Sequence, residues 1–343
     1  MQELEADWHD REICFDVTLD SLELRRGEFI IDSLEPVEDT KGNNGESGVL
    51  QVTNLRMIWM STHNVKTNLS IGYAAVVNIH IRAANSRLKG NCEALYVLTK
   101  YKGSRFEFIF TNLVRDTPRL FTTVQAVFRA YDTSKLYRDL KLRGAVIKDK
   151  ELIILPEEKV FNKIAGVWNL SADQGNLGTF FLTNVRMVWY ANLAENFNVS
   201  IPYIQIKGIR VRESKFGPAL VVTTSNRSGS YVLGFRIDPP EKLHVVVQEV
   251  KSLFKTYSTD PIFGVQFTVE NQAPSLRQLT AARQMDDFEL IDTDETNHDA
   301  LAAYYADGGN KDHDKPPVLN SYLGLAVEKL SGDVTLEQLW SVL

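Results

Sequence analysis

The feature that most constrains the fold of this chain is a long internal repeat. The stretch from Thr53 to Trp59 (TNLRMIW) returns 130 residues later, from Thr183 to Trp189, as TNVRMVW. At the same spacing, positions 28–82 match positions 158–212 at 15 of 55 sites without a gap. A chance similarity would not keep the same offset over that length. A repeat also constrains the fold more strongly than any local pattern. The chain therefore carries one folding module twice.

Each copy begins with short apolar runs that are broken by turn residues. Glycine and asparagine tolerate positive φ, so Gly42–Gly45 (GNNG) and Gly175-Asn176 predict hairpin turns. In both copies a Thr-Asn pair separates two apolar runs, which predicts a tight turn with Asn54 or Asn184 at the bend. The runs indicate about seven strands in each copy.

A helix is predicted at the end of each copy. Apolar residues recur there at spacings of three and four, as on one face of an amphipathic helix. The residues concerned are Leu120, Val124, Val127, Phe128 and Tyr131 in the first copy and Leu243, Val246, Val250, Leu253, Phe254 and Tyr257 in the second. Asp116 and Asp238 stand just before prolines and are predicted to start these helices. The simplest architecture is an antiparallel sheet curled around a core and closed by a terminal helix.

Three regions follow from these patterns. Residues 1–133 form the first module, and residues 134–257 form a linker helix and the second module. The linker, from Lys135 to Arg143 (KLYRDLKLR), is basic and amphipathic. Such a helix suits either a membrane surface or the packing of its leucines on a neighbouring domain, and we expect the packing. Residues 258–343 form an acidic linker and tail, which we expect to be partly disordered with short helices.

Charge is distributed unevenly along the chain. Residues 258–343 hold 15 acidic and 5 basic residues, whereas residues 1–257 hold 33 basic and 29 acidic ones. A mildly basic body can meet an anionic surface, but the sequence pI of about 5.6 argues against a nucleic-acid-binding protein. No stretch approaches the roughly 20 apolar residues that cross a bilayer, and the charged N-terminus lacks the apolar core of a signal peptide. We expect a cytosolic protein with two ordinary thiols, Cys14 and Cys92.

The last residues predict a docking helix over 334–343. Thr335, followed three residues later by Gln338, reads as a capping box. One apolar face follows, made of Leu336, Leu339, Trp340 and Leu343. A helix this short is marginal alone, so these four residues are predicted to dock on the chain's own body or on a partner.

No motif for catalysis or for a cofactor appears. The six histidines and two cysteines show no metal-ligand spacing. The GNNGESG segment lacks the Gly-Lys-Ser/Thr ending of a phosphate-binding loop. Asp292, Asp294 and Glu295 begin like a calcium loop, but Asn297 and Ala303 stand where such a loop needs glycine and a carboxylate. We therefore expect neither an enzyme, a metal nor a cofactor, and we read the acidic run as a solvated linker.

The pattern resembles a known superfold and a known family. Seven strands with a C-terminal helix resemble the pleckstrin-homology fold, and the Gly-x-Leu-x-x-Thr-Asn-x-Arg stretch from Gly48 to Arg56 resembles its lipid-binding GRAM and GLUE branches. Longer runs closely resemble the Bardet–Biedl syndrome 5 family over nearly the whole chain. These runs are Glu38–Gly45, Arg105–Val114, Gly166–Ser171, Asp173–Phe181, Ser258–Val265 and Ala303–Gly308.

The resemblance implies a fold and a function. The fold would be mainly β, with two tandem pleckstrin-homology-like barrels of about seven antiparallel strands, each capped by its α-helix. The function would be that of a subunit of the BBSome, a coat-like complex that carries membrane proteins into and out of cilia. The implied partners are other BBSome subunits, especially β-propeller subunits, phosphoinositide-containing membrane and ciliary membrane-protein cargo, without nucleic acid. The implied locations are the cytoplasm, the cilium with its membrane, and the basal body.

Phosphoinositide recognition would need several convergent Lys and Arg side chains on loops of the barrel. The first copy offers Lys41 in its first hairpin, a presumed loop from Arg82 to Lys89, and Lys100 nearby; the second also offers Arg210. The candidates are Lys41, Arg82, Arg87, Lys89, Lys102 and Arg105 in the first copy and Arg212, Lys215 and Arg227 in the second. Arg56 and Arg186, inside the repeat motif, are expected to brace the fold instead.

Two alternatives are weighed at this stage, and only the first stays open. The first is a pure scaffold, in which both modules bind only protein and the basic loops are incidental. The second is a phosphatase or similar enzyme with an attached GRAM-like module. The enzyme is disfavoured because the two modules leave no segment of the size of a catalytic domain.

Overall fold

The computed structural model describes residues 10–42, 45–115, 117–171, 175–266, 318–320 and 325–327. Of the predicted tail, it describes two short strands that pair antiparallel, β19 (Val318–Asn320) and β20 (Leu325–Val327). The predicted docking helix over 334–343 lies outside the described residues, as does Asp116.

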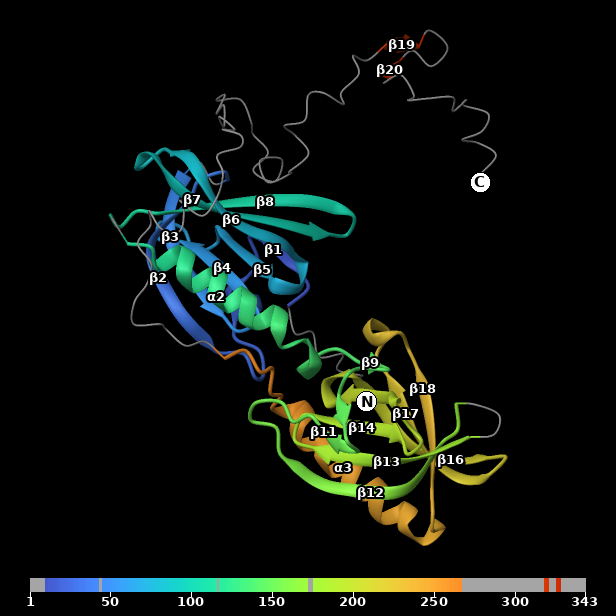
Figure 1. The fold of residues 1–343 in the computed structure, drawn as a ribbon. Helices are drawn as coiled ribbons and strands as arrows, with labels where there is room; N and C mark the ends of the chain where they lie inside the picture. Colours follow the sequence, from blue (N-terminus) through green and yellow to red (C-terminus); the bar gives the residue numbers. More distant parts are fainter. Residues whose placement is uncertain are drawn as a thin grey trace.

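The first module is one antiparallel sheet with a helix. Its strands lie in the order β1-β5-β4-β3-β2-β8-β7-β6. They are β1 (Ile13–Phe15), β2 (Ile30–Asp39), β3 (Glu46–Thr53), β4 (Arg56–Ser61), β5 (Asn68–Gly72), β6 (Val76–Ser86), β7 (Gly90–Tyr101) and β8 (Ser104–Asn112). A short helix α1 (Leu19–Leu22) follows β1, and the long helix α2 (Arg119–Thr133) ends the module (Figure 1).

The second module repeats this plan. Its sheet has the order β16-β17-β18-β12-β13-β14-β15-β9. The strands are β9 (Lys141–Leu142), β12 (Val160–Asn169), β13 (Asn176–Thr183), β14 (Arg186–Ala191), β15 (Ala194–Pro202), β16 (Ile206–Ser214), β17 (Gly217–Thr224) and β18 (Val232–Ile237). Helix α3 (Leu243–Thr259) closes the module, and a separate hairpin of β10 (Ile147–Lys148) and β11 (Glu151–Leu152) precedes β12.

The predicted pleckstrin-homology-like plan is confirmed in both copies. Seven strands and a C-terminal helix recur in the same order, and within the described residues each sheet gains one short edge strand, β1 or β9. That strand escaped prediction because two or three residues carry too little pattern. The first and last strands of each sheet do not pair with each other. Apolar residues of α2 and α3, among them Val124 and Val250, fill each core instead.

Three local predictions are corrected. The presumed loop from Arg82 to Lys89 is mostly the end of β6, and only residues 87–89 form a turn. The linker is a 3-10 turn, η3 (Lys135–Tyr137), followed by β9, so no linker α-helix forms. Asp238 does not start α3, because its carboxylate accepts hydrogen bonds from Trp168 Nε1 and Arg236 Nη2 and the 3-10 turn η6 (Pro240–Lys242) comes first. A carboxylate with nearby donors need not cap a helix.

The two modules meet through buried contacts. Arg138, which is 4% exposed, stacks on the Tyr131 ring with its guanidinium carbon 3.6 Å from the ring centroid. Its carbonyl accepts a hydrogen bond of 2.5 Å from Gln205 Nε2 of the second module. The Tyr131 hydroxyl donates to Asp10 Oδ2 at 2.8 Å. The sequence reading missed this junction because its members are far apart along the chain.

A segment that follows the second module returns to the first. Phe263 and Val265, 3% and 5% exposed, belong to the first module's core cluster although they come after α3. Figure 1 shows this stretch (orange) running from α3 toward the start of β2. Gly27 and Gly264 fit because they lack side chains: an added Cβ would lie 2.4 Å from the Pro261 carbonyl oxygen or 2.2 Å from the Tyr137 ring. We call residues 261–265 the return segment.

Candidate functional site

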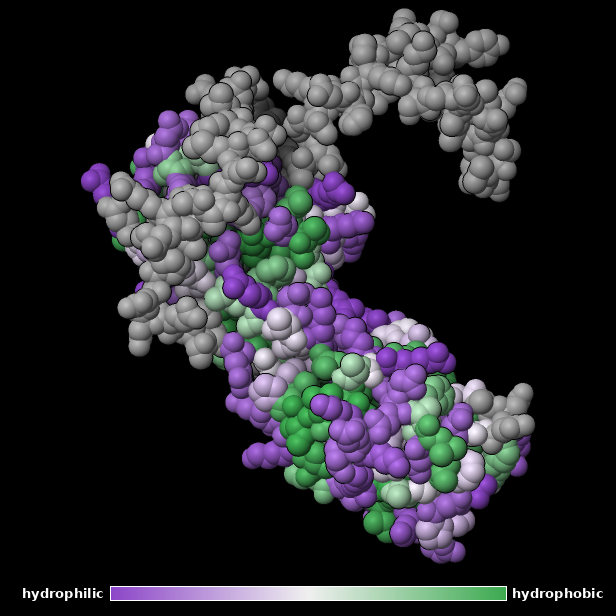
Figure 2. Space-filling view, in the orientation of Figure 1, coloured by the Kyte–Doolittle hydropathy of each residue, from purple (hydrophilic) through white to green (hydrophobic). Residues whose placement is uncertain are grey.

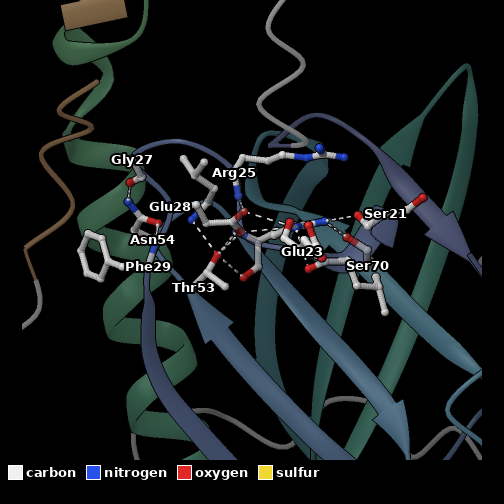
Figure 3. Close-up of polar contacts among 12 residues, drawn as sticks. Ser21, Glu23, Arg25, Gly27, Glu28, Phe29, Thr53, Asn54 and Ser70 are labelled. Carbon is white, nitrogen blue, oxygen red and sulfur yellow. Dashed lines mark hydrogen bonds and ion pairs between the residues drawn. The ribbon is translucent and has the colours of Figure 1, made fainter. Parts of the chain in front are cut away.

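A buried arginine occupies the same place in both copies, and Figure 3 shows the polar contacts around Glu28 in the first copy. Arg56 Nε lies 2.9 Å from Glu28 Oε1, and Arg186 Nε lies 2.8 Å from Glu158 Oε1. In each copy a second guanidinium nitrogen reaches a serine hydroxyl of the neighbouring strand, Ser70 at 3.2 Å or Ser200 at 3.1 Å. The side chains of all four charged residues are at most 1% exposed.

The remaining donors of each arginine go to the backbone of the preceding segment. Arg56 Nη2 donates to the carbonyls of Leu22 and Glu23, and Arg186 Nη2 donates to that of Ile153. A buried guanidinium is tolerated only when its charge is paired and its donors are used. Both arginines therefore brace the entering chain against the sheet, as expected, and neither guanidinium is exposed.

Arg87 and Lys89 lie at the β6–β7 turn, whereas Lys41 follows β2 and reaches β8, and bonds within the module involve all three residues. Lys41 Nζ pairs with Glu107 Oε2 at 2.7 Å. Lys89 Nζ donates to the carbonyls of Asn112 at 2.7 Å and Val114 at 3.2 Å. The backbone N–H of Arg87 donates to Glu38 Oε1 at 3.1 Å, and the Ser86 hydroxyl bonds to the other oxygen of that carboxylate. Glu38 thus ties the turn to the hairpin between β2 and β3.

Glu38 is a residue that sequence reasoning missed. It is fully buried on β2, and its role depends on a turn almost 50 residues further along the chain. The second copy has Trp168 at the same position, but 40 of the 55 aligned positions differ between the copies, so this difference alone does not single out Glu38.

A separate group of cations occupies the β7–β8 hairpin. Lys100 on β7 stands directly opposite Arg105 on β8, and Lys102 is at the turn between them with φ +49°. All three are exposed. Lys102 Nζ lies 5.0 Å from the ring centroid of Tyr101, and no described carboxylate forms an ion pair with any of the three. Like charges placed directly opposite each other destabilise a strand pair, so an anion here would relieve their repulsion.

Arg87 and Lys89 cannot share one small ligand with the β7–β8 hairpin. The β6–β7 turn precedes β7 and the β7–β8 hairpin follows it, and β7 has 12 residues. At about 3.3 Å per residue the two ends of this strand lie roughly 40 Å apart. Figure 1 shows the two hairpins pointing away from each other. Arg82 belongs to neither group, because it lies along β6 with its guanidinium carbon 5.9 Å from the Tyr96 ring centroid.

The second copy places its candidates differently. Arg210 and Arg212 lie exposed on the edge strand β16, and Lys215 lies at the turn to β17. Arg227 lies in the 3-10 turn η5 (Asn226–Ser228), at the opposite end of β17. This turn is anchored toward the module junction, since the Ser225 hydroxyl donates to Gln205 Oε1 at 2.8 Å. Arg227 is the only basic residue in the sequence of the loop between β17 and β18. The first copy has a cationic hairpin at the equivalent place.

The β16–β17 hairpin also lacks the tether that fixes its counterpart. Trp168 replaces Glu38 and donates its indole N–H to Asp238 at 2.8 Å. At the turn itself, the Ser214 hydroxyl donates to the Gly217 carbonyl at 2.7 Å, within the same hairpin. Residues 210–213 are all exposed, in contrast to β6, where Ala84 and Ser86 are buried. We call residues 206–217 the β16–β17 arm.

Apolar side chains are exposed on parts of the second module. Figure 2 shows hydrophobic residues gathered on the face that carries β11 in Figure 1. In this part of the chain Leu142, Ile153 and Ile154 are 49%, 47% and 55% exposed. Large exposed apolar patches on soluble proteins mark interaction sites.

Groups with reactive potential are few in the described part of the chain. Cys14 and Cys92 are free thiols, as expected, and burial is the main cause that raises the pKa of each. Across the same residues, no group of three or more His, Cys, Asp and Glu side chains has a metal-binding arrangement. None of the described helices is long and apolar enough to cross a membrane.

Comparison with known proteins connects both modules to one family. Residues 28–133 match the family model of the Bardet–Biedl syndrome 5 protein N-terminal PH-like domain, and residues 141–267 match that of its second PH-like domain. The BBSome complex member BBS5 of Danio rerio is 57% identical over 340 residues, which cover 99% of this chain and 98% of the relative. The chain belongs to the BBS5 family.

Other BBS5 relatives agree over the same span. That of Mus musculus is 57% identical over 343 residues and covers both chains completely. The Caenorhabditis elegans member bbs-5 is 43% identical over 353 aligned positions, covering 98% of this chain and 96% of its own. The family model of the second BBS5 domain extends to residue 267, so it includes the return segment that completes the core of the first module.

Proposed function

We propose that the chain is a non-enzymatic subunit of the BBSome that attaches to phosphoinositide-containing membrane through the β7–β8 hairpin of its first module. Trafficking of membrane proteins to and from cilia would be the purpose of this attachment. The relatives' names support BBSome membership. The observation that carries the lipid assignment is the grouping of Lys100, Lys102 and Arg105 on one tight, exposed hairpin.

The chemistry of that hairpin suits a phosphorylated headgroup. Charge-assisted hydrogen bonds from Lys and Arg to phosphate are short and strong, and an arginine can contact two oxygens at once. Each basic residue near an anionic membrane surface contributes about 1 kcal/mol, so three of them give a modest affinity. We expect lipid binding to be weak for the isolated chain and to depend on other contacts within the complex.

Protein contacts are proposed for the second module. Its exposed apolar residues Leu142, Ile153 and Ile154 suit a partner subunit, for which a β-propeller is the expected class. The apolar face of residues 334–343 is a second candidate contact, and membrane-protein cargo is a third class of partner.

Vesicle flotation tests the lipid assignment. The full chain should float with phosphatidylcholine vesicles that contain phosphatidylinositol 3-phosphate at low ionic strength. Lys102→Glu combined with Arg105→Glu should lower the bound fraction at least about tenfold, because two attractive charges become repulsive. The matched control is Lys251→Glu with Lys255→Glu on α3, which makes the same charge change at two exposed lysines.

A pure scaffold is the competing function. The bonds of Lys41 to Glu107 and of Lys89 to backbone carbonyls favour it, since they use candidate cations for structure. Equal flotation of wild type and the Lys102/Arg105 variant, or equal loss in the α3 control, would contradict the lipid assignment and support the scaffold.

A further inference from the structure

The β16–β17 arm presents an unpaired strand edge with a strong charge. β16 is the last strand of its sheet, and within the described residues no strand pairs with its outer edge. Lys207, Arg210, Arg212 and Lys215 lie along this arm, with Glu213 as the one acidic residue. Exposed edges are places where an extended chain can add as a further strand.

The positive charge of the arm favours pairing with an acidic segment. Residues 134–257 hold 18 basic and 11 acidic residues, so the second module is a basic body. Arg210 and Arg212 are exposed with Val211, which is 40% exposed, between them. An extended segment that alternates acidic and apolar residues would match both features, because successive side chains of a strand point to opposite faces.

The chain itself contains such a segment beyond α3. Residues 286–299 (DDFELIDTDETNHD) hold seven acidic residues and neither Lys nor Arg. Within them Asp287, Phe288, Glu289 and Leu290 alternate acidic and apolar side chains. This segment begins about 20 residues after Gln266, the last described residue of the body, and 20 extended residues reach roughly 66 Å. A domain of roughly 125 residues has a radius of gyration of about 14 Å, so this reach is long compared with the second module.

We propose that residues 286–295 pair with the outer edge of β16 as an intramolecular strand. The acidic side chains would face Arg210 and Arg212, and the backbone would satisfy the open edge. Because the segment and the edge belong to one chain, their effective concentration is on the order of millimolar, so even a weak pairing is populated.

This inference does not depend on lipid binding by the first module. It concerns the second module alone, and its test uses a peptide instead of a vesicle. Its failure would leave the β7–β8 hairpin assignment untouched, and the reverse also holds.

Peptide binding to the full chain provides the test. The probe is a fluorescently labelled peptide of residues 284–297, and the readout is its anisotropy at low ionic strength. Asp286→Asn, Asp287→Asn, Glu289→Gln and Asp292→Asn together should free the arm, so this variant should bind the probe at least about tenfold more tightly than wild type. Adding Arg210→Glu and Arg212→Glu should abolish the binding. Adding Lys251→Glu and Lys255→Glu on α3 instead should leave it unchanged.

Two further measurements separate strand pairing from general attraction. A scrambled peptide of the same composition should bind at least about tenfold more weakly than the probe, because it breaks the alternation. Amide exchange of residues 207–213 should be slower in wild type than in the acid-neutralised chain. Absence of probe binding to the neutralised chain, equal binding of the scrambled peptide, or unchanged amide exchange would each overturn the proposal.

Discussion

The two copies of the module share a buried arginine–glutamate pair, which we call the brace, and they differ at their hairpins. In both, a guanidinium at most 1% exposed pairs with a glutamate about 2.9 Å away and bonds to a serine on the next strand. At the hairpins, the first copy carries Lys100, Lys102 and Arg105 where the second has Arg227 alone. Because the brace is buried, its residues are the same in both copies. The hairpins are exposed to solvent, so their residues can differ.

The copies also differ in what completes their cores. The second module's core cluster is built from residues between Ile164 and Val250, with Leu140 and part of α3 packed against it. The first module's cluster needs Phe263 and Val265, and Ile204 of the second module packs against it as well. The first module is thus built around chain that follows the second. The difference teaches that a sequence repeat need not be two independent folding units.

The strongest test of the shared brace is to remove it from each copy in turn. Arg56→Ala and Arg186→Ala should each lower the free energy of unfolding of their own module by about 3–5 kcal/mol, because each leaves a buried glutamate unpaired. Arg56→Ala should be the costlier change, since Arg56 bonds to two backbone carbonyls through Nη2 and Arg186 to one. Denaturant-dependent amide exchange, resolved by module, measures both values.

An exposed ion pair serves as the control for this experiment. Lys163→Ala removes the pair with Glu151, whose side chains are 41% and 70% exposed, and should change stability by less than about 1 kcal/mol. If either arginine variant proved as mild as this control, the brace would not be equivalent in the two copies.

The unequal cores predict a smaller effect that crosses between modules. Phe263→Ala should lower the free energy of unfolding of the first module by about 3 kcal/mol, because a buried aromatic side chain is lost from its core. Amides of β2 and α2 should then exchange faster, while those of β13 and β14 keep their wild-type rates. Ile262→Ala, at a half-buried neighbour, is the matched control and should cost less. Faster exchange confined to the second module would contradict the assignment of the return segment.

Much of the fold could be predicted from the sequence because the repeat constrains it twice. The approximate number of strands and both terminal helices followed from apolar runs and turn residues such as Asn54 and Asn184, which lie at the bends between paired strands. The bracing role of Arg56 and Arg186 also followed from their place inside the repeat motif. These features depend on neighbouring residues or recur 130 residues apart, so they can be predicted from a single sequence.

The candidate site could be predicted only in part. Residue type identified the cations, but their grouping depends on which hairpins share an end of the sheet. The presumed loop that held Arg82 is a strand, and Lys89 is committed to the carbonyls of Asn112 and Val114. Glu38 and the return segment act across long separations in the chain, and a single sequence holds no signal for such contacts.

The central claim is that the first copy, through its β7–β8 hairpin, meets the anionic surface while the equivalent loop of the second copy does not. Amide exchange of the full chain with and without vesicles containing phosphatidylinositol 3-phosphate compares both loops in one experiment. The account predicts slower exchange at residues 100–105 on vesicles and unchanged exchange at residues 225–231. Protection at residues 225–231 alone, or at neither loop when vesicles are bound, would contradict it.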